Sequence, residues 1–125
     1  MKSLFGAVIV TLLAAGAQAQ TLFSPDFPLL VRNAVETDLS EFKWKQRPVV
    51  VFADSADDPA FIEQLERLAN GAEDLTERDV VVIVDTDPDA RSDIRLKIRP
   101  RGFMLTLVGK DGAIKLRKPF PWSVR

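Results

Sequence analysis

The sequence of 125 residues contains no cysteine, no histidine and no tyrosine. The lack of cysteine excludes disulfide bonds and thiol nucleophiles, and the lack of histidine excludes imidazole acid–base catalysis near neutral pH. Zinc sites built from cysteine and histidine are excluded for the same reason. Carboxylates, amines, hydroxyls and the backbone are the groups that remain for binding or chemistry.

The rest of the composition, 46% hydrophobic and 28% charged, is typical of one globular domain. The net charge of −1 conceals a split, because residues 20–90 hold 16 acidic and 6 basic side chains, while residues 91–125 hold 2 and 10. The basic part predicts an anion-binding face. The alternative is a solvated surface that the acidic part of the same protein neutralises. Aromatic residues do not alternate with these bases, so nucleic acid is not a predicted partner.

The N-terminus has the pattern of a secretory signal peptide, which we assign to residues 1–19. Met1 and Lys2 form a positive start, residues 4–15 are an uncharged apolar run, and Ala-Gln-Ala at 17–19 places small side chains at the cleavage site. A membrane-spanning helix needs about 20 apolar residues, and this run is shorter. We expect cleavage near Ala19, a periplasmic or secreted protein, and no stable membrane anchor afterwards.

The mature chain predicts an extended segment followed by one domain. Residues 20–38 contain two prolines and no hydrophobic period, which predicts an extended arm or linker. Residues 39–125 form the predicted domain. Within it, the apolar runs 48–53 and 80–84 predict parallel strands with both faces buried. The helical spacing after Asp58 predicts the helix that connects them.

The next segment carries two competing patterns. Residues 87–89 (Asp-Pro-Asp) suit the start of a second helix, but Ile94, Leu96 and Ile98 alternate with charged residues as in a strand. We favour a short helix that unwinds near Leu96.

The last two runs predict an antiparallel hairpin. Residues 103–108 and 113–117 flank a Gly-Lys-Asp-Gly turn, whose Asp-Gly pair suits a tight connection. The predicted fold class is therefore α/β, with a mixed sheet of two parallel core strands and an antiparallel hairpin.

The order of these elements matches the core of the thioredoxin fold. Three stretches, Phe-Lys-Trp-Lys-Gln-Arg-Pro at 42–48, Glu-Arg-Asp-Val at 77–80 and Gly-Lys-Asp-Gly at 109–112, resemble an exported bacterial family known as domain of unknown function 4174. The resemblance spans residues 39–118. It implies a thioredoxin-like three-layer sandwich, and it implies no particular reaction, because that family has no assigned activity.

The chain departs from thioredoxin-type oxidoreductases at the positions that carry their chemistry. Their Cys-x-x-Cys motif follows the first core strand at a helix N-terminus, where residues 57–60 of this sequence are Asp-Asp-Pro-Ala. Their cis-proline before the third core strand corresponds to Met104. Because the sequence contains no sulfur nucleophile, disulfide exchange is excluded. We predict a protein that is not an enzyme and needs no cofactor.

Thioredoxin-like domains also continue past the edge strand into a helix that covers one sheet face. Here residues 119–125 follow that strand without a helical pattern, which predicts an open apolar face. The predicted covers are Phe120 and Trp122, the N-terminal arm, a partner, or residues lost by truncation of the reading frame.

Acidic side chains follow both parallel strands. These residues are Asp54, Asp57, Asp58, Asp85, Asp87 and Asp89. Because the carboxyl ends of parallel strands meet at one edge of a sheet, they predict a divalent-cation site for binding or hydrolysis, with Asp85, Asp87 and Asp89 as its ligands. The alternative is helix capping by Asp58 and Asp87 with ordinary loop solvation.

The candidate anion-binding residues are Arg95, Arg99, Arg101 and Lys110. Lys110 also suits simple turn chemistry, and Trp44, although it is flanked by lysines, is expected to pack against the sheet. Three hypotheses follow. The chain is a non-catalytic module that binds a protein partner or an anionic ligand, a cation-dependent protein, or a structural subunit that docks through an open sheet face. The sequence leaves the oligomeric state open.

Overall fold

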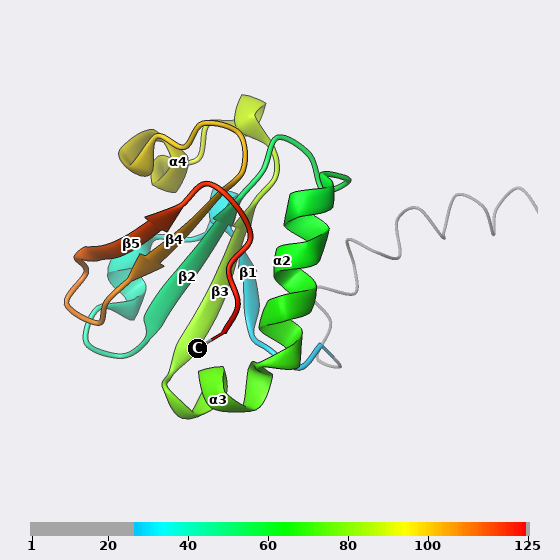
Figure 1. Cartoon of the computed structure of the whole chain (residues 1–125). Coiled ribbons are helices and arrows are strands. Elements are labelled where there is room, and N and C mark those ends of the chain that lie inside the picture. The colour runs from blue at the N-terminus through cyan, green and yellow to red at the C-terminus, as the bar shows by residue number, and fades with distance from the viewer. Residues whose placement is uncertain (1–26, 125) are drawn as a thin grey trace, which may run out of the picture.

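The computed structural model describes residues 27–124, and the expected signal peptide lies outside this range. Figure 1 shows one twisted sheet with helices against both faces. The strands are β1 (Val31–Asn33), β2 (Arg47–Phe52), β3 (Val80–Asp85), β4 (Met104–Val108) and β5 (Ile114–Lys118). The α-helices are α2 (Pro59–Asn70), α3 (Ala72–Glu77) and α4 (Asp93–Ile98). The short 3₁₀ helices are η1 (Ala34–Glu36), η2 (Leu39–Phe42) and η3 (Pro88–Ala90).

The sheet has the strand order β1-β3-β2-β4-β5. β2 and β3 pair in parallel with Val49 opposite Val82, and β4 pairs antiparallel with both β2 and β5. The predicted α/β class, the parallel pair and the hairpin are confirmed. The arrangement is consistent with a thioredoxin-like sandwich.

Part of the segment expected to be an arm belongs to the sheet. β1 pairs in parallel with β3, Val31 lying opposite Val82, and the side chains of Leu29, Val31 and Ala34 are buried. The sequence gives no period here because the strand is only three residues long, and only its first residue faces the core.

The two faces of the sheet bury separate apolar clusters. On one face, α2 packs Phe61, Leu65 and Leu68 against Val49 and its neighbours. On the other face, η2 and α4 supply a second set of side chains. That set includes Phe42, Ile94 and Ile98, which lie with Val50 and Ile83. Consecutive strand residues point to opposite faces, which is why the central strands are apolar throughout.

The second predicted helix begins and ends later than expected. Residues 88–90 form only a 3₁₀ turn, and α4 starts at Asp93 because the Ser92 hydroxyl accepts a hydrogen bond from the backbone N–H of Arg95 at 3.0 Å. The predicted unwinding near Leu96 is wrong. Ile94 and Ile98, four residues apart, face the core while Leu96 is exposed, and this is helical spacing.

Within the described residues no helix follows β5. Residues 119–124 instead run back beside α2 over the sheet (Figure 1). The rings of Phe120 and Trp122 do not insert into the core, since 54% and 39% of these residues remain exposed. Val124 packs against the buried cluster on this face.

Candidate functional site

The six acidic residues that follow β2 and β3, which we call the strand-end rim, do not act as a unit. Asp85 is buried and binds Arg95, whose Nε and Nη2 donate to Asp85 Oδ1 at 3.1 and 2.9 Å. The Ser92 hydroxyl donates to Asp85 Oδ2 at 2.5 Å, and the backbone N–H of Asp87 donates to Oδ1 at 3.3 Å. Both carboxylate oxygens of Asp85 therefore already accept hydrogen bonds from the protein.

Arg95 makes further hydrogen bonds within the protein, all at the ends of β2 and β3. Its Nη2 also donates to the carbonyl oxygens of Ala53 and Asp85, both at 3.1 Å, and its guanidinium lies 5.5 Å from the centre of the Phe52 ring. The side chain is only 11% exposed. The pair thus joins α4 to the ends of β2 and β3, and Arg95 is not available as the anion-binding group that the sequence suggested.

The other acidic residues of the strand-end rim cap helices or face solvent. Asp58 accepts a hydrogen bond from the N–H of Ala60 at 2.9 Å at the start of α2, and Asp87 accepts one from Asp89 at 3.2 Å. Asp54 and Asp57 are exposed. In residues 27–124 no three acidic side chains are arranged to hold a metal ion. The alternative of capping describes Asp58 and Asp87, and the predicted ligand set of Asp85, Asp87 and Asp89 is not brought together.

The slot that corresponds to the thioredoxin redox motif, residues 57–60, lies at the start of α2 as expected. Asp58 is the N-cap and Pro59 occupies the first helical position. These residue types begin a helix and supply no nucleophile comparable to a thiolate.

The candidate basic residues are dispersed. Arg99 and Arg101 are exposed after the end of α4, and Arg99 has the left-handed conformation that ends this helix. Lys110 Nζ lies 2.7 Å from Asp79 Oδ2, and its hydrogen bond, followed by its charge, lowers the pKa of Asp79. Arg95, Arg99, Arg101 and Lys110 therefore do not form one site.

The three stretches that carry the family resemblance meet at the opposite end of the sheet from the strand-end rim. Lys110 binds Asp79, the backbone N–H of Trp44 donates to the Lys110 carbonyl at 2.6 Å, and the N–H of Arg47 donates to the Asp79 carbonyl at 2.8 Å. The three stretches that occur together in the sequence are therefore also in contact with one another in the fold.

Trp44 is not packed against the sheet, contrary to our expectation. It is 70% exposed and has a φ of 66°, a left-handed conformation that disfavours a bulky side chain. The hydrogen bond to Lys110 holds the backbone there, so that the indole projects from the turn. Sequence patterns based on periodicity do not register such a turn.

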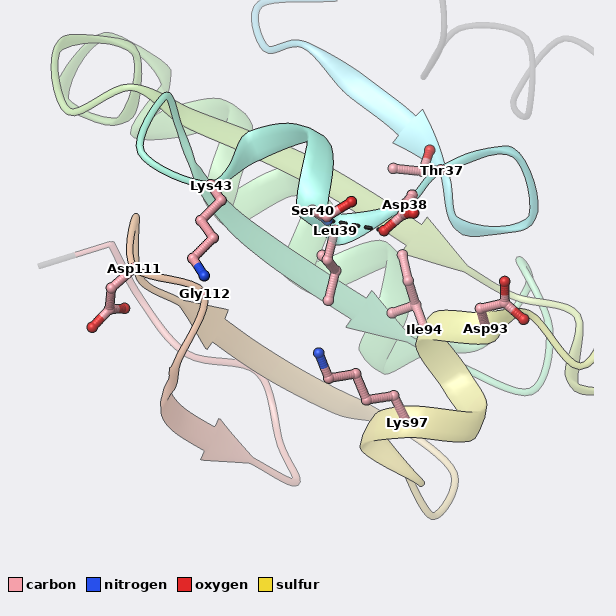
Figure 2. Close-up of a pocket in the computed structure, with 10 residues that line it drawn as sticks. All are labelled: Thr37, Asp38, Leu39, Ser40, Lys43, Asp93, Ile94, Lys97, Asp111 and Gly112. Carbon is pink, nitrogen blue, oxygen red and sulfur yellow. Dashed lines mark hydrogen bonds between the residues drawn. The ribbon is translucent and has the colours of Figure 1, made fainter.

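A hollow with polar and charged lining lies between η2 and α4, and we call it the η2–α4 cleft. Its volume is about 260 Å³. It is lined by Thr37, Asp38, Leu39, Ser40, Lys43, Asp93, Ile94, Lys97, Asp111 and Gly112. Figure 2 shows Lys97 Nζ beneath Leu39 and Lys43 Nζ beside Gly112, while the carboxylates of Asp93 and Asp111 point away from the space between η2 and α4.

The open charges that line the η2–α4 cleft are the ammonium groups of Lys43 and Lys97 together with the carboxylate of Asp38. Within residues 27–124 neither Lys43 nor Lys97 makes an ion pair. Asp111 instead pairs with Lys115 at 3.0 Å. The backbone N–H of Ser40, followed by its side chain, lowers the pKa of Asp38, and the charge of Lys97 acts in the same direction. The cleft can therefore accept an anionic group between two lysines that come from different elements.

The sequence does not reveal this cleft as a site. Lys43 belongs to the first resemblance stretch and Lys97 to the basic C-terminal part, but 54 positions separate them in the sequence. They share one face because η2 and α4 cover the same side of the sheet, and only the topology shows this.

None of the helices in the described part of the chain is long and apolar enough to cross a membrane.

The family model described as domain of unknown function (DUF4174) matches residues 38–125, which is more than two thirds of the chain and includes all three resemblance stretches. The chain belongs to this DUF4174 family.

Proposed function

We propose that this protein is an exported, non-catalytic binding module on a thioredoxin-like scaffold, and that its η2–α4 cleft binds an acidic segment of a partner protein. The observation that carries the proposal is the pair of ammonium groups of Lys43 and Lys97, which line one cleft without an ion-pair partner among residues 27–124. Two cations from separate elements favour an anionic ligand held at a defined position.

The surroundings of the cleft favour a protein segment over a small free anion. Trp44 follows Lys43 directly and is exposed, as is Leu96 beside Lys97. Tryptophan is enriched at the energetic centres of protein interfaces, because its large ring buries much area at low entropic cost. Trp44 and Leu96 do not line the cleft itself, but each is next in the chain to a lysine that does. A segment that extends beyond the two lysines can therefore contact these exposed apolar side chains.

We propose a non-catalytic role because the side chains that most often carry catalysis are missing or already bonded within the protein. The chain has no cysteine or histidine, and the buried titratable pair Asp85 and Arg95 is saturated by internal hydrogen bonds. The side chains that remain open to solvent, such as Lys43, Lys97 and Trp44, are suited to binding. Export rests on the pattern of residues 1–19.

The test is a titration of the ¹⁵N-labelled mature chain with acetyl-pentaglutamate-amide, followed by NMR. We expect shifts at residues 37–43, 93–97 and 111–112, and weaker binding at higher salt. Lys43→Gln/Lys97→Gln should lower the affinity by about tenfold, since each lost charged contact weakens binding by roughly threefold or more. Lys45→Gln, an exposed lysine outside the cleft, is the matched control.

Inorganic phosphate is titrated in parallel. Equal or tighter binding of phosphate at the same residues would assign the cleft to a small anion and overturn the protein-segment proposal. Shifts that are absent, or that persist unchanged in Lys43→Gln/Lys97→Gln, would overturn the site itself.

A further inference from the structure

A second hollow lies on the other face of the sheet, between α2, α3 and the hairpin, and we call it the α2 groove. It has a volume of about 330 Å³. Its walls are mostly apolar and include Leu68, Leu75, Leu105, Leu107 and Leu116. This is the face on which the sequence predicted an uncovered apolar surface. The groove remains although residues 122–124 already line it.

The contact between Gln64 and the C-terminal tail has the geometry of peptide recognition. Gln64 lies on α2 and is fully buried, yet its side-chain amide binds the backbone of one residue at two points. The N–H of Trp122 donates to Gln64 Oε1 at 2.7 Å, and Gln64 Nε2 donates to the Trp122 carbonyl at 2.9 Å. A buried amide paired in this way recognises an extended main chain whatever its side chain, as a strand edge does.

The tail makes two further contacts with α2 and its end. Arg67 Nη1 donates to the carbonyl of Pro121 at 3.4 Å. The side chain of Val124 lies so close to Gly71 that a Cβ atom on this glycine would be only 2.7 Å away. The groove therefore holds a backbone at Trp122 and an apolar side chain two residues later.

The tail occupies the groove incompletely. Trp122 remains 39% exposed, with Lys118 Nζ 4.2 Å from the centre of its ring, and Ser123 is exposed. Val124 is the residue of this segment that packs against the buried cluster. Leucine side chains of the groove thus keep unfilled space beside them, which an occupant with larger inward-facing side chains would fill.

We propose that the α2 groove binds an extended apolar segment of a partner protein, with Gln64 holding its backbone, and that residues 121–124 occupy the same site in cis. The partner segment places an apolar side chain two residues after the one that Gln64 holds. This inference is independent of the η2–α4 cleft, which lies on the opposite face of the sheet.

The test uses a fluorescent probe with the sequence of residues 118–124 (Lys-Pro-Phe-Pro-Trp-Ser-Val, with blocked ends), and measures its anisotropy with the mature chain. Val124→Asp places a charge against the apolar wall and should release the tail, so the probe should bind at least about tenfold more tightly than to the wild type. Ala113→Asp, which adds the same charge at an exposed residue of the β4–β5 turn outside the groove, should leave the affinity near that of the wild type.

A second substitution identifies the recognition element. Gln64→Leu in the Val124→Asp background should lower the affinity for the probe by about tenfold or more, because two hydrogen bonds to the backbone of the probe are lost. Equal affinity of the wild type and Val124→Asp, or full affinity after Gln64→Leu, would overturn the proposal, provided that circular dichroism shows folded protein.

Hydrogen exchange on the wild-type chain decides the matter if a variant does not fold. Saturating probe should speed exchange of the Trp122 amide, which leaves Gln64 when the tail is displaced, and unchanged exchange would contradict the proposal.

Light scattering tests whether a second copy of this chain occupies the groove. A dimer that Gln64→Leu converts to a monomer would show that the tail of a second copy fills the groove, and would overturn a partner segment.

Discussion

At the carboxyl ends of β2 and β3, the charge of Asp85 is buried and bonded to Arg95, whereas in the η2–α4 cleft the ammonium groups of Lys43 and Lys97 open to solvent. In the sequence only the acidic residues at the strand ends formed an evident cluster, because Lys43 and Lys97 lie 54 positions apart. The two regions differ in the hydrogen-bond partners that the fold supplies. A buried charge depends on its internal partner and destabilises the fold when that partner is removed, whereas an exposed charge without an internal partner is available to a ligand.

The largest expected effect comes from breaking the internal pair. Arg95→Ala leaves Asp85 buried without its cation, and we expect a loss of about 3–5 kcal/mol in the free energy of unfolding, measured in urea. Asp85→Asn/Arg95→Met removes both charges and should recover most of that loss. A loss below about 1 kcal/mol in Arg95→Ala would show that the pair does not hold α4 to the strand ends.

A smaller effect is expected at Ser92. Its hydroxyl donates to Asp85 and accepts from Arg95 N at the start of α4, so Ser92→Ala should lower the free energy of unfolding by about 1–2 kcal/mol. Ser92→Thr, which keeps the hydroxyl, serves as the control in the same urea experiment. Equal losses in both variants would place the effect in packing and not in the hydrogen bonds.

The lysines of the cleft should contribute little to stability. Lys43→Gln/Lys97→Gln removes two exposed charges without an ion pair among the described residues, and we expect a change within about 0.5 kcal/mol in the unfolding free energy. A loss similar to that of Arg95→Ala would erase the distinction between the two regions.

The smallest effect concerns the exposed pair of Lys110 and Asp79. The pKa of Asp79 is lowered below 3.8 in the folded protein, so its contribution to stability is present above the unfolded pKa and is lost as the pH falls through the folded pKa. Lys110→Gln should return the pKa of Asp79 toward 3.8, which an NMR titration of its carboxyl carbon measures. An unchanged pKa would remove Lys110 as the cause, while Lys115→Gln is the control at the same hairpin.

Much of the fold was predictable because burial imposes a period on the sequence. The runs of β2 and β3 predict strands because they are short and β-branched, and the spacing of α2 predicts a helix. β1 was missed because a single buried residue makes no period. The start of α4 was misplaced because Ile94, Leu96 and Ile98 fit both a strand and a helix, and the hydrogen bonds of Ser92 decide between them.

The sites were less predictable, because each depends on contacts between distant segments. Nothing near Asp85 in the sequence shows that Arg95 will neutralise it, and nothing near Trp44 shows the positive φ that exposes the ring. Lys43 and Lys97 become neighbours only when η2 and α4 pack on one face. The sequence shows the chemical type of each residue, but it does not show which residue will be its partner in the fold.

The most direct test of the distinction between the two charged regions is urea unfolding with and without saturating acetyl-pentaglutamate-amide. A ligand that binds only the folded state raises its stability, by about 2.7 kcal/mol when its concentration is 100 times the Kd. We predict that the ligand stabilises the wild type and Lys45→Gln by this amount, and Lys43→Gln/Lys97→Gln, which binds about tenfold more weakly, by only about half as much. An equal rise in all three proteins, or no rise in the wild type, would contradict our proposal that the η2–α4 cleft is the binding site.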